Sequence, residues 1–142
     1  MKLIGGFFEL ALGGKNEVIY HDNTVALSSG RASFNFILQQ TNPAKAYLPF
    51  FTCDALLEPL SENKISFEFY SIDRNLEPVN AIDLSENEFF LYINYFGIKN
   101  EFVNNLVSKY SGNLIVDNAQ AFFERGYGNA WSFNSARKFF GV

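Results

Sequence analysis

Residues 114–120 read LIVDNAQ, in which three apolar residues run directly into an acid and further polar side chains. Such a short, continuous apolar run predicts a strand that is buried on both faces. A helical pattern spans residues 101–110 before it, and Ser111-Gly112-Asn113 ends that helix. A helix followed by a buried strand is the repeating unit of parallel sheets, so this stretch decides the fold class.

The same alternation is found upstream. Phe34, Ile37 and Leu38 have the spacing of one helix face, which predicts a helix over residues 31–40. Another helix is expected from Cys53 to about Ser61. Further strands are predicted at 24–27, 46–51, 65–70 (half buried) and 89–95. We therefore predict an α/β fold, a mostly parallel sheet with helices on both faces, in a single domain over residues 1–142.

Composition narrows the class of protein without identifying a reaction. The 142 residues are 48% hydrophobic and 18% charged, which is typical of a globular chain. A net charge of −4 without a basic run argues against nucleic acid as a partner. No apolar run is long enough to cross a membrane, so a cytoplasmic protein is expected. One histidine, His21, and one cysteine, Cys53, make a zinc site or a Ser-His-Asp arrangement improbable, and no metal is predicted.

Three polar clusters fall next to predicted strand ends, at residues 28–31, 94–97 and 117–120. Ligands of parallel sheets bind beyond the carboxyl ends of the strands. The first cluster stands before a predicted helix, where free backbone N–H groups suit a phosphate. Ser28 or Ser29 could equally serve there as an ordinary helix cap.

Two single residues also have a chemical and a structural interpretation. Asp117 at a strand end could pair with a protonated ring nitrogen, hold a metal, or cap a turn. Lys138 is followed by Phe139 and Phe140, and a lysine that aromatic rings desolvate becomes a nucleophile for Schiff-base formation. A lysine whose stem merely packs beside core rings would look the same in sequence.

The order of these motifs carries more information than any one of them. A strand leads into Ser29-Gly30, then come residues 48–52 (LPFFT), 116–121 (VDNAQA) and Ser132-Phe133 before Lys138. In this order the chain resembles the DegT/StrS-like sugar aminotransferases, which are pyridoxal-phosphate (PLP) enzymes of fold type I. The resemblance runs from residues 5–9 (GGFFE) to Val142.

The resemblance implies roles for single residues. Lys138 would form the Schiff base with PLP and shuttle the proton between the substrate Cα and the cofactor. Asp117 would pair with the pyridine nitrogen, and Gln120 would lie beside the ring near its 3′ oxygen. Ser29, Gly30 and Arg31 occupy the phosphate-loop positions, with Ser132 or Ser135 as a further phosphate ligand.

The chain also departs from the family's pattern. Arg31 stands where threonine or serine is usual, and a guanidinium would contact a phosphate differently. Cys53 stands where an aromatic ring commonly stacks on the cofactor. The spacing from serine to lysine differs from the commonest pattern, which leaves Ser132 and Ser135 as alternatives.

The implied reaction transfers an amino group from an amino-acid donor to a keto sugar carried on a nucleotide. The chain is shorter than members of the family, so we expect a truncated form with weak or no activity alone and a tendency to form a homodimer or higher oligomer. An inactive domain of the same ancestry that serves as a binding module is the first alternative. A small aromatic-rich α/β module without a cofactor is the second.

Overall fold

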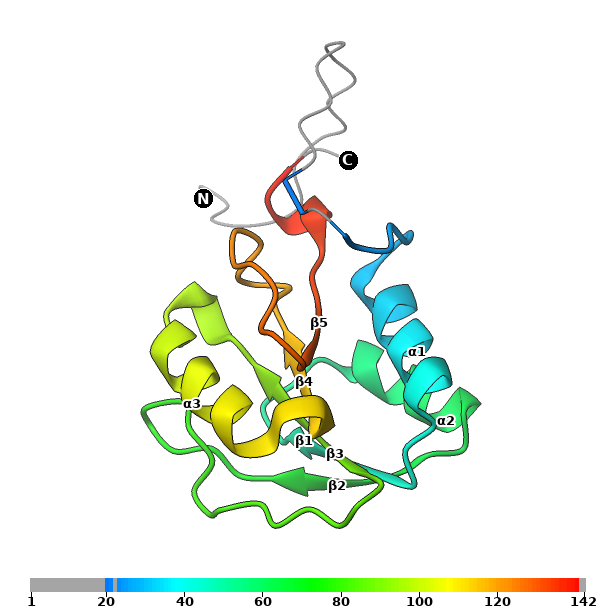
Figure 1. Ribbon diagram of the computed structural model, residues 1–142, viewed down its shortest axis with the longest axis vertical. Coiled ribbons are helices and arrows are strands. Elements are labelled where there is room, and N and C mark those ends of the chain that lie inside the picture. Colours follow the sequence, from blue (N-terminus) through cyan, green and yellow to red (C-terminus); the bar gives the residue numbers. More distant parts are fainter. Residues whose placement is uncertain (1–19, 22, 141–142) are drawn as a thin grey trace, which may run out of the picture.

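The computed structural model describes residues 20, 21 and 23–140, so Val142 and the motif at 5–9 lie outside the described residues. Five parallel strands form one sheet in the order β2-β1-β3-β4-β5 (Figure 1). The strands are β1 (Lys45–Pro49), β2 (Ser66–Tyr70), β3 (Glu88–Ile93), β4 (Leu114–Asp117) and β5 (Trp131–Phe133). The predicted α/β class with a parallel sheet is confirmed.

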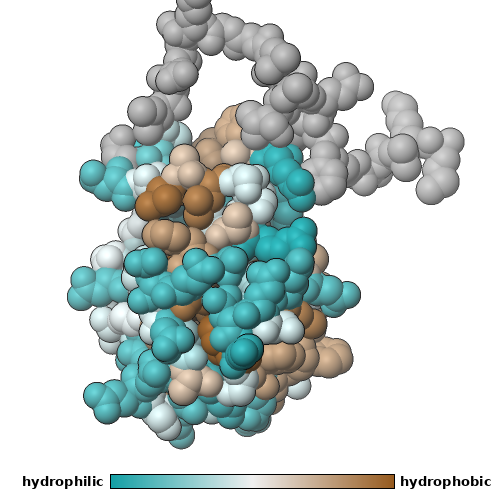
Figure 2. Space-filling model, turned by 90° about the vertical axis from the view of Figure 1, so that its right-hand side faces the viewer, coloured by the Kyte–Doolittle hydropathy of each residue, from teal (hydrophilic) through white to brown (hydrophobic). Residues whose placement is uncertain are grey.

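Helices lie on both faces of this sheet. The helices α1 (Gly30–Thr41) and α2 (Leu57–Glu62) lie on one side, and α3 (Asn100–Tyr110) lies on the other (Figure 1). A 3-10 turn over Asp54–Leu56 precedes α2, so the helix predicted from Cys53 begins in a tighter form. Hydrophilic side chains cover much of the side of α1 and α2, with hydrophobic patches among them, as amphipathic helices require (Figure 2).

The chain order of the strands places a crevice in the sheet. From β1 the chain moves outward to β2 and then returns across β1 to form β3 on its other side. Connections therefore leave the neighbouring carboxyl ends of β1 and β3 in opposite directions, which is where parallel sheets bind ligands. Asn94 follows β3 and its amide is buried, donating to the Asn100 side-chain oxygen at 2.7 Å, so it holds this region together.

Three predictions at the level of strands need correction. Residues 24–27 do not form a strand, because an extended segment needs a neighbour and within the described residues this one has none. The strand β5 was not predicted, since its three residues are too few to show a period. The strand β2 was expected to be half buried, but it lies at the sheet edge and four of its five residues are exposed.

The contact between Phe34 and Phe133 provides a test of the core. Phe34 is fully buried in α1, and its ring stacks on Phe133 of β5 with centroids 5.6 Å apart. Phe34→Ala is expected to lower the free energy of unfolding by about 3–5 kcal/mol, because it removes a buried ring and leaves a cavity. Urea unfolding measures this. The matched control, Phe50→Ala at an exposed ring, should change it by less than about 1 kcal/mol, and equal losses would contradict the packing described.

Candidate functional site

A cleft of about 230 Å³ opens at the carboxyl ends of β1, β3 and β4. We call it the lysine cleft, and its lining consists of Phe51, Thr52, Cys53, Ile93, Tyr95, Asp117, Ala119, Gln120 and Lys138. Three residues that the sequence marked for chemistry, Asp117, Gln120 and Lys138, are thus brought to one place. The cleft coincides with the crevice that the strand order predicts.

Asp117 is the last residue of β4 and is 8% exposed. Its Oδ1 accepts a hydrogen bond of 2.7 Å from the Ala119 N–H. Burial raises the pKa of this carboxyl from 3.8 to about 6, although the Ala119 N–H and the positive charge of Lys138 both act to lower it. The result is a buried acid whose ionised form is under-compensated by the protein and favours a cation in the cleft.

Gln120 is held by the loop that follows β3. Its side-chain Oε1 accepts a hydrogen bond of 2.9 Å from the Phe96 N–H. Phe96 adopts a left-handed backbone conformation, with φ of 56°, which is uncommon for a residue with a side chain. The next residue, Gly97, also has a positive φ, and a Cβ there would lie 3.3 Å from the Gln120 carbonyl. The two loops are therefore packed tightly against each other.

The segment after β1 supplies residues that sequence reasoning did not assign. The Phe51 ring stacks on that of Tyr95, with centroids 5.7 Å apart and an angle of 15° between planes. The Tyr95 hydroxyl donates to the Phe51 carbonyl at 2.8 Å. Thr52 Oγ1 is buried and is the one such side-chain atom without a hydrogen-bond partner within the part of the chain that the structure describes. In the sequence, the one indication that Phe51 and Thr52 lie at a ligand site is their position just after a strand end.

Lys138 is exposed at the end of the 3-10 turn Ala136–Lys138. It lines the lysine cleft although it lies 21 positions after Asp117 in the sequence. Among the described residues, nothing buries Lys138, so the partial desolvation that its aromatic neighbours suggested is not found at this exposed position. Its ammonium group still acts on Asp117, whose pKa it lowers. An amine and a buried carboxylate therefore share one cleft.

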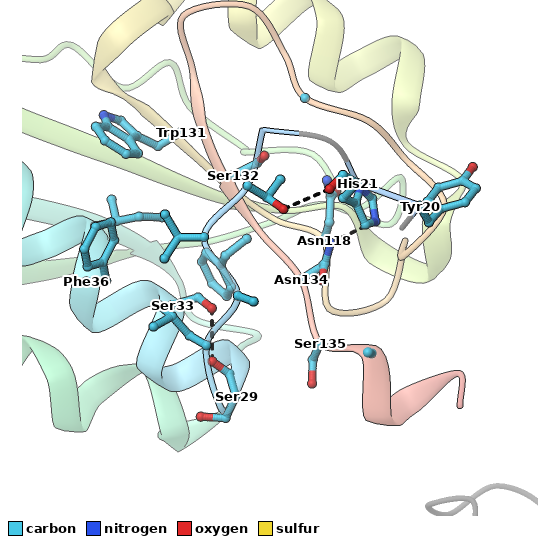
Figure 3. A pocket seen from close by; sticks show the side chains of 18 of the residues that line it. Tyr20, His21, Ser29, Ser33, Phe36, Asn118, Trp131, Ser132, Asn134 and Ser135 are labelled. Carbon is cyan, nitrogen blue, oxygen red and sulfur yellow. Dashed lines mark hydrogen bonds between the residues drawn. The ribbon is translucent and has the colours of Figure 1, made fainter. Parts of the chain in front are cut away.

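A larger cleft of about 640 Å³ lies between the start of α1 and β5 (Figure 3). We call it the serine cleft, because Ser29, Ser132 and Ser135 line it together with Asn118 and His21. It contains neither Asp117 nor Lys138. The two clefts share the segments that line them, since Asn118 faces one and Asp117 the other. The predicted serines thus line one cleft together, and Lys138 lines the other.

The first phosphate-loop residues have structural roles. The Ser29 Oγ accepts a hydrogen bond of 3.2 Å from the Ala32 N–H and so caps α1, which is the ordinary interpretation of that cluster. A Cβ on Gly30 would make only ordinary contacts, the nearest at 3.5 Å to the Asn134 carbonyl. Arg31 forms an ion pair with Glu58 and lines neither cleft.

His21 is far in sequence from the polar clusters, but the fold brings it to the serine cleft. Its Nε2 donates to the Phe122 carbonyl at 2.8 Å, and its ring meets that of Phe122 edge to face. This contact spans 101 positions along the chain, so no local pattern could have indicated it.

No family model matches the sequence, and no curated protein matches it. Solved structures do resemble the fold. A 3-amino-5-hydroxybenzoic acid synthase is 14% identical, with a TM-score of 0.61 over 80% of this chain and 34% of that chain. DesV of S. venezuelae, in complex with a ketimine intermediate, is 15% identical, with a TM-score of 0.55 over 75% and 33%. The chain shares the α/β fold of the aligned part of these proteins, as the resemblance to aminotransferases of PLP fold type I predicted.

The sugar aminotransferase CalS13 from Micromonospora echinospora is a further similar structure, 15% identical over 66% of this chain and 30% of that chain, with a TM-score of 0.49. In all three comparisons the chain spans about a third of the length of the solved protein. At 14% and 15% identity, the likeness to the synthase and to DesV establishes the fold, and the function has to be argued from the site.

The raised pKa of Asp117 predicts a pH-dependent effect of Asp117→Asn. Because the folded state raises this pKa from 3.8 to about 6, ionisation of Asp117 lowers stability as the pH rises through that interval. The amide cannot ionise and can still accept from the Ala119 N–H. The free energy of unfolding of the variant, relative to that of the wild type, should therefore rise by up to about 3 kcal/mol between pH 4 and pH 7.

Urea unfolding of both proteins at several pH values measures this difference. Asp54→Asn, at an exposed acid, controls for the loss of one negative charge. A difference between Asp117→Asn and wild type that stays constant from pH 4 to pH 7 would show that the carboxyl does not titrate abnormally.

Proposed function

We propose that the chain is the cofactor-binding part of a PLP-dependent aminotransferase, with PLP held in the lysine cleft. The observation that carries the proposal is that Lys138 and the buried Asp117 line one cleft at the carboxyl ends of the strands. The fold shared with solved aminotransferases supports it. The proposal covers residues 1–142 as one unit.

The residues present fit this cofactor. PLP carries an aldehyde, a ring nitrogen that can be protonated, a ring oxygen and a phosphate. The cleft offers an exposed amine at Lys138, a buried carboxylate at Asp117 and the Gln120 side chain. Thr52 Oγ1 adds a buried hydroxyl that lacks a partner in the protein itself. Together these groups are complementary to a flat ring that carries charged and polar substituents.

When bound, PLP supplies a carbonyl that condenses with amines and a ring that accepts electrons as the substrate Cα–H bond breaks. Asp117 binds the ring nitrogen and holds its proton there, because the buried carboxylate is stabilised by a cation. Lys138 Nζ would be the amine that holds the cofactor, and the same amine would move the proton at the substrate Cα. Gln120 orients the ring through its side-chain amide.

In this proposal, residues of the serine cleft would hold the phosphate. The hydroxyls of Ser132 and Ser135 and the N-terminus of α1 lie there, and a helix N-terminus favours an anion. Ser29 would contribute its backbone more than its hydroxyl, which already caps the helix. Arg31 would have to leave Glu58 to reach the phosphate. Ser132 and Ser135 remain alternatives as the second ligand.

For substrates we propose an amino-acid donor and a nucleotide-linked keto sugar acceptor, in a cytoplasmic enzyme that forms a homodimer. These finer statements rest on the motif resemblance together with the shared fold. Among the described residues, no helix is long and apolar enough to span a membrane.

An inactive binding module of the same fold is the second candidate. It is favoured by one observation, that Ser29 and Arg31 are already engaged in a cap and an ion pair. This alternative predicts that PLP either does not bind or binds without reacting at Lys138.

Reduction with borohydride distinguishes the two candidates. Purified protein is mixed with PLP, its absorbance spectrum is recorded, and borohydride then fixes any adduct for peptide mapping. The aminotransferase proposal predicts a covalent adduct on Lys138, because Asp117 and Gln120 would orient the cofactor toward that amine. Lys138→Ala should abolish both the adduct and its absorbance band.

Surface lysines also react with PLP, so Lys64→Ala serves as the matched control at an exposed lysine. It should leave the band and the Lys138 adduct unchanged. An adduct distributed over several lysines, or a spectrum identical in wild type and Lys138→Ala, would refute the proposal and leave the binding module as the better account.

A further inference from the structure

Thr52 has a hydroxyl that the protein leaves unsatisfied. Its Oγ1 is buried and without a partner, while the residue lines the lysine cleft. Buried polar atoms are nearly always hydrogen-bonded in native proteins, so each exception requires an explanation. Because Thr52 lines the cleft, a ligand bound there would supply the missing hydrogen-bond partner.

Phe51, the preceding residue, has an aromatic ring that is half free. One side of the ring stacks on buried Tyr95, yet the side chain remains 59% exposed and borders the same cleft. Cys53, the other neighbour, offers a small exposed thiol and no ring. Among the described residues of the cleft, Phe51 therefore has the accessible aromatic surface.

The backbone holds this segment in place without a ligand. The Phe50 N–H donates to the Tyr70 carbonyl at 2.8 Å, and the Thr52 N–H donates to the Phe50 carbonyl at 3.0 Å. The Tyr95 hydroxyl donates to the Phe51 carbonyl at 2.8 Å. Three hydrogen bonds thus hold the backbone that carries the Phe51 ring and the Thr52 hydroxyl beside the cleft.

We propose that Phe51 and Thr52 form the wall that receives the ligand, a flat heteroaromatic ring with a polar substituent. The ligand ring lies against Phe51, and its substituent hydrogen-bonds to Thr52 Oγ1. This inference rests on the proposed function for its choice of ligand. It assigns the aromatic contact to Phe51 in place of Cys53, and it gives a hydrogen-bonding role to Thr52, to which the motif resemblance assigns none.

The test measures affinity with two probes, PLP and 4-deoxypyridoxine 5′-phosphate, which lacks the aldehyde and cannot react with Lys138. Protein fluorescence or calorimetry gives the dissociation constants. Phe51→Ala should weaken both probes by about 3- to 10-fold, whereas Phe51→Tyr keeps the ring and should bind as the wild type does. Phe50→Ala, at the neighbouring exposed ring outside the cleft, is the matched control and should change neither constant.

Thr52 gives a second readout, which a purely structural role would not produce. Thr52→Val removes a buried unpaired hydroxyl, so the ligand-free protein should melt at the same or a higher temperature. The same variant should bind both probes about 2- to 10-fold more weakly, because the hydrogen bond to the ligand is lost. Thr52→Ser should restore the affinity.

The outcomes separate this inference from the function on which it rests. Unchanged constants in Phe51→Ala and Thr52→Val, beside a normal Lys138 adduct, would overturn the inference alone. Failure of the wild type to bind either probe, with no Lys138 adduct, would overturn the proposed function and this inference together.

Discussion

Parallel pairing of β3 between β1 and β4 is the constraint on which the rest of the structure depends. Ile93 pairs with Asp117, and Tyr47 of β1 pairs with Phe90 of β3. This register aligns three strand ends at one level, so that the residues following each strand meet. Without it, Thr52, Tyr95 and Asp117 would be far apart, because more than 60 positions separate the first from the last. The cleft is therefore a product of backbone pairing more than of side-chain attraction.

The electrostatics of the cleft oppose the ligand-free state. Asp117 is placed in a buried position by an apolar strand, and burial disfavours its charged form, as its raised pKa records. Lys138 and one backbone N–H compensate in part. Thr52 adds an unsatisfied hydroxyl. Strain of this kind at one place, with a well-packed core below it, is typical of a site arranged for something that binds there.

Much of this could be predicted from sequence, and the reasons are local. The apolar runs before Asn94 and Asp117 predicted two central strands because burial on both faces leaves no room for polar residues. Helix α1 followed from the spacing of Phe34, Ile37 and Leu38. The family resemblance, and no local pattern, implied that Asp117, Gln120 and Lys138 act together, and the fold brings all three to one cleft.

What sequence reasoning missed depends on tertiary contacts. The segment at 24–27 has strand-like residues, but a strand exists only beside a partner. The resemblance implies a phosphate-loop position for Arg31, and sequence reasoning could not foresee its ion pair with Glu58, 27 positions away. The Thr52 hydroxyl is unremarkable in sequence, because its lack of a partner appears only when its surroundings are known.

The left-handed backbone at Phe96 determines which atoms of Gln120 a ligand can meet. Because the Phe96 N–H is bound to Oε1, the carboxamide cannot turn over, and its NH2 group is the end left for other contacts. A ligand oxygen beside Gln120 could therefore accept a hydrogen bond from the NH2 group and leave the Phe96 contact intact, whereas an amino substituent would have to use the second lone pair of Oε1.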